Sequence, residues 1–292
     1  MPVTDHLHTL SQLRDELRDA LSAIDSLGLR WQGTRFHHYL RTLEEEAFLK
    51  DRKIFIPKKR EPQFVYELWE TIGQSRQLVQ TRNIWSLVQE EHLRSKLATV
   101  LTGRALQSGV PDHDAARNTL LELLTAWLLH NHGFAIELTN QEADVIAKID
   151  GIPPFAVECK RPASGEGLRK NFKAIRRQLT KRYTRHGYQH GIAVVAVDRV
   201  LNLSSEPPVR RSFDFVKLFI QKTLCEATDF LRLIADDVGF SPASTPIGAV
   251  ILVGAAFVFQ PFGVTTIEHL GFFNMAPLED PRIAAVAALS NR

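Results

Sequence analysis

Two short apolar segments flank an Asp150-Gly151 dipeptide, and this arrangement constrains the chain more than any other feature. Asp-Gly between such segments is a strong β-hairpin signal, so residues 143–146 and 155–160 are expected to pair as antiparallel strands. Side chains alternate between the two faces of a strand. Glu158 and Lys160 should therefore share one face of the hairpin.

The register of this hairpin decides whether the acidic residues meet. If the loop has three residues, Ile149 lies opposite Pro153 and Asp144 lies opposite Glu158. A two-residue loop would instead place Asp144 opposite Val157, unless a β-bulge restored the pairing. The first register brings two carboxylates and a lysine to one patch of the sheet.

Two carboxylates beside a lysine are typical of a magnesium site. Mg²⁺ prefers oxygen ligands and is usually held by one or two carboxylates, with water and substrate phosphate completing its shell. Asp144, Glu158 and the backbone carbonyl of Cys159 are the expected ligands, for Mg²⁺ or Mn²⁺. Lys160 would orient a metal-bound water and stabilise developing negative charge. The alternation places the Cys159 side chain on the opposite face, as a core residue.

Asp144 and Glu158-Cys159-Lys160, followed by Arg161-Pro162, resemble the signature of the PD-(D/E)xK nuclease superfamily. The similar region covers roughly residues 112–200. Ala143 stands where the superfamily name has a proline, a position that varies within the superfamily. The resemblance implies a restriction-endonuclease-like fold and metal-dependent hydrolysis of phosphodiester bonds.

The same resemblance implies two further site residues. A helix that precedes the first core strand commonly offers a glutamate to the site, and Glu122 holds that place, as a further candidate metal ligand. A glutamine on a later helix approaches the site in several branches, and Gln178 corresponds to it. The alternatives remain that Glu122 is a solvated helix position and that Gln178 is a polar residue at the edge of an apolar stripe.

A basic helix is predicted from about residue 168 to residue 185. Its apolar residues recur at spacings of three and four and would be buried, while its remaining surface carries only positive charge. Such a face beside a phosphodiester site predicts contacts to a nucleic-acid backbone. The cations, with Arg161 just before them, are Arg169, Lys170, Lys173, Arg176, Arg177, Lys181, Arg182 and Arg185.

Composition narrows the class of protein. The 292 residues have a net charge of only +3, so the positive charge is local. Two cysteines, neither at zinc-finger spacing, favour a reducing compartment. The N-terminal residues lack the apolar stretch of a signal peptide, and the apolar run 248–259 is too short to span a bilayer. We expect a soluble, cytoplasmic protein.

The chain is expected to form two domains. Residues 1–110 read as an all-helical domain, with a first helix capped by Asp5 and further helices over 31–50 and 62–103. The leucine stripe of the first helix favours packing within its own domain, with a dimer seam as the alternative. Residues 111–292 would form the nuclease-like domain, beyond a break at residues 108–111.

The second domain is expected to be α/β, with a central mixed sheet flanked by helices. The run 192–197 predicts a buried strand. It is reached from the Glu158 strand through the basic helix, so those two strands should be parallel. A helix over 212–237, a strand over 247–259 and an edge strand over 265–273 would complete the fold.

The resulting expectation is a nuclease acting on duplex DNA, in restriction, antiviral (phage) defence or repair. An RNA-cleaving enzyme with the same core, and a catalytically weak nucleic-acid-binding module, are the alternatives. The helices before residue 110 could recognise DNA, join a second copy or a partner subunit, or receive a regulatory signal. Their side chains do not select among these roles.

Overall fold

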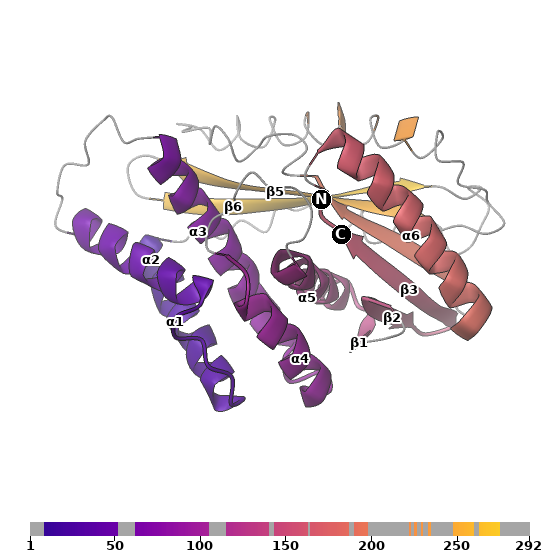
Figure 1. Ribbon diagram of the computed structural model, residues 1–292, viewed down its shortest axis with the longest axis horizontal. Helices are drawn as coiled ribbons and strands as arrows, with labels where there is room; N and C mark the ends of the chain where they lie inside the picture. Colours follow the sequence, from indigo (N-terminus) through magenta and orange to yellow (C-terminus); the bar gives the residue numbers. More distant parts are fainter. Residues whose placement is uncertain are drawn as a thin grey trace.

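The computed structural model describes residues 9–51, 62–104, 115–139, 143–162, 164–186, 190–197, 248–259 and 263–274, with residues 222, 225, 226, 229, 233 and 234. Over these residues the chain is an α/β protein with a mixed six-stranded sheet (Figure 1). The predicted fold class is confirmed at this level. None of the described helices combines the length and apolar character needed to cross a membrane.

The helices are α1 (Leu10–Ser26), α2 (Arg35–Asp51), α3 (Pro62–Thr81), the 3-10 helix η1 (Arg82–Ile84), α4 (Glu90–Leu101), α5 (Ala115–Asn131) and α6 (Gly165–His186). The strands are β1 (Ala135–Leu138), β2 (Val145–Ile149), β3 (Ile152–Lys160), β4 (His190–Ala196), β5 (Gly248–Phe259) and β6 (Gly263–Asn274). Their order in the sheet follows their order in the chain.

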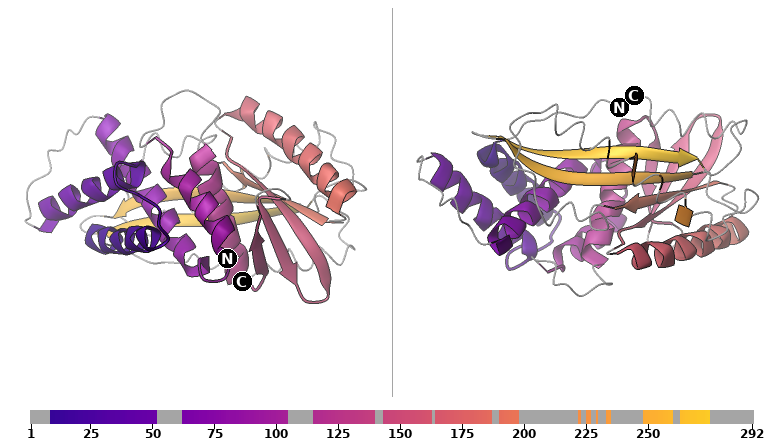
Figure 2. Two further views of the ribbon diagram at one scale, coloured as in Figure 1. Left: turned by 60° about the horizontal axis from the view of Figure 1, so that its bottom comes forward. Right: turned by 90° about the horizontal axis from the view of Figure 1, so that it is seen from above.

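The pairing of β3 with β4 is parallel, with α6 as the crossover between them, as predicted. β4 and β5 are also parallel, and β6 returns antiparallel to β5 as the edge strand. Figure 2 shows the long strands β5 and β6 extending towards the N-terminal helices, where both contact α3. β1 was not predicted, since four residues directly after a helix carry almost no periodic signal.

The hairpin of β2 and β3 has a two-residue turn, so the predicted opposition of Ile149 to Pro153 is wrong. Ile149 pairs with Ile152, and a β-bulge between Ala147 and Ile149 shifts the register. Gly151 adopts a φ of 77°, which a glycine accepts without strain. Beyond the bulge Val145 pairs with Val157, so the alternative with a restoring bulge is the one that forms.

The N-terminal helices pack into a core of their own side chains. Thr9, rather than Asp5, caps α1 through a capping box with Gln12; Asp5 lies outside the described residues. The leucine stripe of α1 is buried against α2 and α3, which leaves no exposed seam for a coiled coil. The predicted helix over 62–103 forms as two helices, α3 and α4, separated by η1, in which Ile84 is buried.

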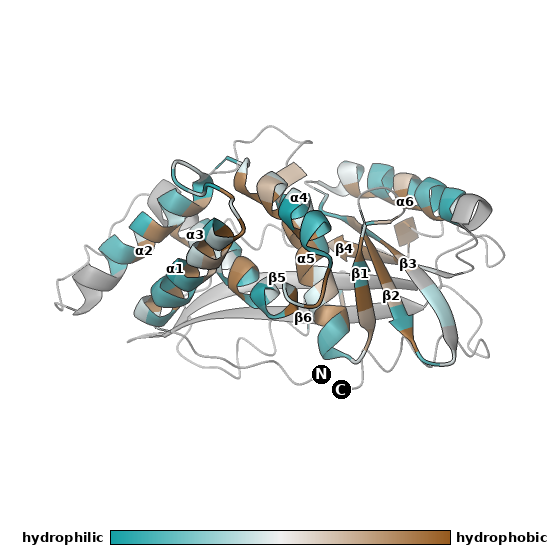
Figure 3. Ribbon diagram, turned by 90° about the horizontal axis from the view of Figure 1, so that it is seen from below, coloured by the Kyte–Doolittle hydropathy of each residue, from teal (hydrophilic) through white to brown (hydrophobic). Residues whose placement is uncertain are grey.

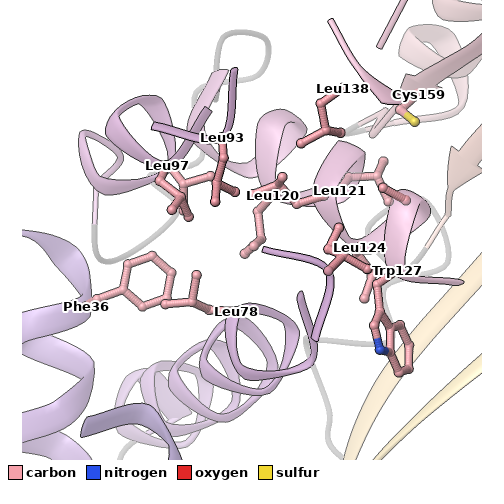
Figure 4. Packing of buried hydrophobic residues seen from close by; sticks show 14 of the residues in the cluster. Phe36, Leu78, Leu93, Leu97, Leu120, Leu121, Leu124, Trp127, Leu138 and Cys159 are labelled. Atoms are coloured by element: carbon pink, nitrogen blue, oxygen red, sulfur yellow. The ribbon is translucent and has the colours of Figure 1, made fainter. Parts of the chain in front are cut away.

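Helix α5 joins this helical region to the sheet. It lies between two groups of buried side chains, Phe36, Leu78, Leu93 and Leu97 on one side and Leu138 and Cys159 on the other (Figure 4). Burying a leucine such as Leu120, which is fully enclosed, stabilises the fold by roughly 1.5–3 kcal/mol. A buried ion pair of 2.6 Å between Arg117 Nε and Glu70 Oε1 also ties α5 to α3.

One hydrophobic cluster therefore runs from α1 to β4. The predicted domain boundary falls in residues 105–114, outside the described residues, and the division into two domains stays a prediction. The helix over 212–237 is described only at isolated positions.

Candidate functional site

The open end of the β2–β3 hairpin brings Asp144, Glu158 and Lys160 together. Asp144 lies just before β2, and its Oδ2 accepts a hydrogen bond of 2.6 Å from the backbone N–H of Cys159. Lys160 Nζ stands 3.7 Å from Asp144 Oδ2 and 3.9 Å from Glu158 Oε2. The three residues singled out by spacing thus meet at one end of the sheet.

Glu158 is the most constrained of these groups. Its side chain is fully buried, and its Oε1 accepts a hydrogen bond of 3.2 Å from Arg182 Nε on α6. Its Oε2 is buried without a hydrogen-bond partner. Burial and the neighbouring Asp144 raise the pKa of Glu158 to about 7, although Lys160 and Arg182 act in the opposite direction. Glu158 Oε2, which has the Lys160 ammonium at 3.9 Å but no hydrogen bond, is a place for a cation.

Glu122 also reaches this site, from α5. Its Oε2 accepts a hydrogen bond of 2.6 Å from Lys96 Nζ on α4. Burial raises the pKa of Glu122, and so does the negative charge of Asp144, while Lys96 and Lys160 act in the opposite direction. A cavity of about 210 Å³ adjoins them, lined by Ser95, Lys96, Thr99, Thr119, Glu122, Thr139, Ala143, Asp144 and Arg182.

Three further positions refine the sequence interpretation. Gln178 lies one turn before Arg182 on α6; its Oε1 is buried without a hydrogen-bond partner, but Gln178 does not line the cavity. Cys159 Sγ contacts Thr125 on α5, and burial raises the pKa of the thiol, as expected of a core residue. Arg182, grouped by the sequence with the surface cations, points into the site instead.

Lys96 was missed by the sequence interpretation. It lies three residues after Leu93 and four before Val100, both buried, so it occupies the core-facing stripe of α4. A lysine on such a stripe is the signal that could have identified it, because a buried lysine requires a partner.

The outer surface of α6 is basic, as predicted, and mostly hydrophilic (Figure 3). Its apolar stripe of Leu168, Phe172, Ile175 and Leu179 is buried. Around an open depression of about 560 Å³ lie Lys173, Arg176, Arg177, Thr180 and Lys181, all exposed.

Two details of the basic helix differ from the prediction. The helix begins at Gly165, three residues earlier than expected, and so includes Glu166, which pairs with Lys170 at 2.9 Å. Lys170 is therefore partly neutralised. Arg169 is exposed, Arg161 is half-buried after β3, and the side chain of Arg185 lies outside the described residues.

The donor set suits a hard divalent cation. Within the described ranges, no three His, Cys, Asp or Glu side chains already form a cluster that could enclose an ion. Mg²⁺ does not require one, because it keeps several waters and takes one or two carboxylates. Asp144 and Glu158 supply two carboxylates, and Glu158 Oε2 makes no hydrogen bond; the Cys159 carbonyl is a further oxygen donor. A cation between the two carboxylates would offset their repulsion.

The raised pKa of Glu158 predicts a pH-dependent stability. Folding raises this pKa from 4.5 to about 7, so the folded protein keeps a proton that the unfolded chain releases in this range. The free energy of unfolding should therefore fall as the pH rises from 4.5 to 7 and level off above 7. Glu158→Gln keeps a neutral side chain, so it should lack this decrease, which amounts to roughly 3 kcal/mol at most. Denaturant unfolding in EDTA tests this; parallel pH profiles for the two proteins would contradict it.

No protein-family model, curated protein or solved structure matches this chain. The function is therefore inferred from the geometry of the site and from the charge of the surface beside it.

Proposed function

We propose that this protein is a metal-dependent nuclease that hydrolyses phosphodiester bonds in DNA, with a restriction-endonuclease-like core, and that it serves restriction, phage defence or repair. The convergence of Asp144, Glu158 and Lys160 at one end of the hairpin carries the proposal. Glu158 Oε2 supports it, because this buried oxygen has a long 3.9 Å ion pair with Lys160 but no hydrogen bond, whereas buried polar atoms with a purely structural role are normally hydrogen-bonded.

Each residue has a distinct task in this proposal. Asp144, Glu158 and the Cys159 carbonyl would hold Mg²⁺ or Mn²⁺. When bound, the cation lowers the pKa of a coordinated water and stabilises charge on the phosphate oxygens. The Lys160 ammonium, held between both carboxylates, orients the attacking water and stabilises the charge that develops on the phosphate. Arg182 fixes one oxygen of Glu158, while the other makes no hydrogen bond and would ligate the cation.

Helix α6 connects this chemistry to a binding surface. Arg182 extends from the buried side of the helix to Glu158. The exposed side carries Lys173, Arg176, Arg177 and Lys181. From Lys173 to Lys181 the helix spans about 12 Å, enough to follow neighbouring phosphates of one strand. Phosphate contacts of this kind position a nucleic acid without reading its sequence.

Cleavage assays with supercoiled plasmid, linear duplex, single-stranded DNA and RNA test the activity. Asp144→Asn and Lys160→Met should each lower magnesium-dependent cleavage by about 100-fold or more, as expected for loss of a group that stabilises the transition state. Asp150→Asn and Lys148→Met, exposed positions on the same hairpin, are the matched controls and should retain activity.

The outcomes separate the candidate functions. Cleavage of RNA alone would overturn the choice of DNA. Salt-sensitive binding without cleavage of any substrate would identify a binding module, and equal activity of the Lys160→Met and Lys148→Met variants would refute the role of Lys160.

Binding measurements test the surface of α6 separately. With Ca²⁺ in place of Mg²⁺, Lys173→Gln combined with Arg177→Gln should weaken duplex binding and lower the salt slope, d log K/d log [salt], by about 2 in magnitude. The matched control combines Arg18→Gln with Arg41→Gln, exposed positions on α1 and α2. Equal salt slopes for the two double variants would show that α6 does not contact phosphates.

A further inference from the structure

Lys96 is a cationic group that the helical region before the sheet contributes to the site. Its side chain is only 8% exposed, and its ammonium lies 2.6 Å from Glu122 Oε2. α4 is fixed in place by the buried Leu93 and Leu97, which pack against α5. The amine is therefore held at Glu122 by the packing of two helices.

The charges at the site are already balanced by this arrangement. Three carboxylates face three cations at ion-pair distance: Lys96 Nζ lies 2.6 Å from Glu122, Lys160 Nζ 3.7 Å from Asp144, and Arg182 Nε 3.2 Å from Glu158. One added divalent cation gives a net charge of two positive units, which suits a phosphodiester and the negative charge of its attacking oxygen. A second would leave excess positive charge in a partly buried cavity, which is costly.

A second metal would need a carboxylate beyond Asp144 and Glu158. Two-metal sites hold their ions about 3.5–4 Å apart and share a bridging carboxylate between outer ligands. Among the residues that the structure describes, Glu122 is the carboxylate that lines the same cavity as Asp144 and would act as the outer ligand. Lys96 already donates a hydrogen bond to one of the two carboxylate oxygens of Glu122, Oε2, so the negative charge of Glu122 is already matched by an ammonium.

We propose that Lys96 occupies the place of a second cation, so that this site binds one divalent ion and Glu122 positions Lys96 instead of ligating metal. The inference rests on the proposed function, because it concerns the same site. It also gives the N-terminal helices a definite role: α4 supplies a fixed positive charge on the cavity wall, beside the hydroxyls of Ser95 and Thr99.

Counting bound Mn²⁺ in the full-length protein tests this without any substrate. Calorimetric titration should give one ion per chain for the wild type, and the Mn²⁺ electron paramagnetic resonance spectrum should be that of an isolated ion. Lys96→Met removes the charge and keeps the length of the side chain, so it should raise the count to two, with a magnetically coupled pair. Lys96→Met combined with Glu122→Gln should return the count to one, and Lys148→Met should leave it unchanged.

Several results would overturn the inference. Two ions in the wild type would do so even if Lys96→Met did not fold, and so would a single ion in a folded Lys96→Met protein. Cleavage by a wild type that binds two ions would remove the inference but leave the nuclease proposal standing. A wild type that binds no ion and cleaves nothing would remove both.

Discussion

The register of one hairpin governs the rest of the site. The two strands are joined by a two-residue turn, and the β-bulge between Ala147 and Ile149 shifts their register so that Val145 pairs with Val157. This register places Asp144 beside the end of β3. The hydrogen bond from the Cys159 N–H to Asp144 Oδ2 then fixes the carboxylate. A slip of one residue would exchange the faces of every side chain on β2 and separate the acids.

The two faces of β3 contact different helices. Cys159 packs towards α5, which is itself enclosed by the N-terminal helices. Glu158 and Lys160 lie on the other face, where α6 supplies Arg182. Glu158 and Lys160 on β3 and Arg182 on α6 are thus held by regular elements, and Asp144 directly precedes β2, which limits their movement and favours a fixed geometry. The buried charges remain tolerable because each has a partner of opposite sign.

Local periodicity was sufficient to predict that Asp144, Glu158 and Lys160 lie close together. It did not predict which residues of other elements contact them. Glu158 and Lys160 share a face because side chains alternate along any strand, and the Asp-Gly turn indicated their nearness to Asp144. The sequence left the turn length open between three residues and two residues with a bulge, since a bulge at Lys148 depends on packing and leaves no mark in the sequence. Lys96 and Arg182 reach the site through contacts between distant elements, so the sequence predicted a nucleic-acid contact for Arg182 and no role for Lys96.

The central claim is that Asp144 and Glu158 hold one divalent ion between them. Anomalous diffraction from a crystal grown with Mn²⁺ tests it most directly. The account predicts an anomalous peak about 2.1 Å from a carboxylate oxygen of each residue, with the Cys159 carbonyl as a further ligand. Saturating Mn²⁺ with no peak at this position, or with a peak that contacts neither carboxylate, would contradict it.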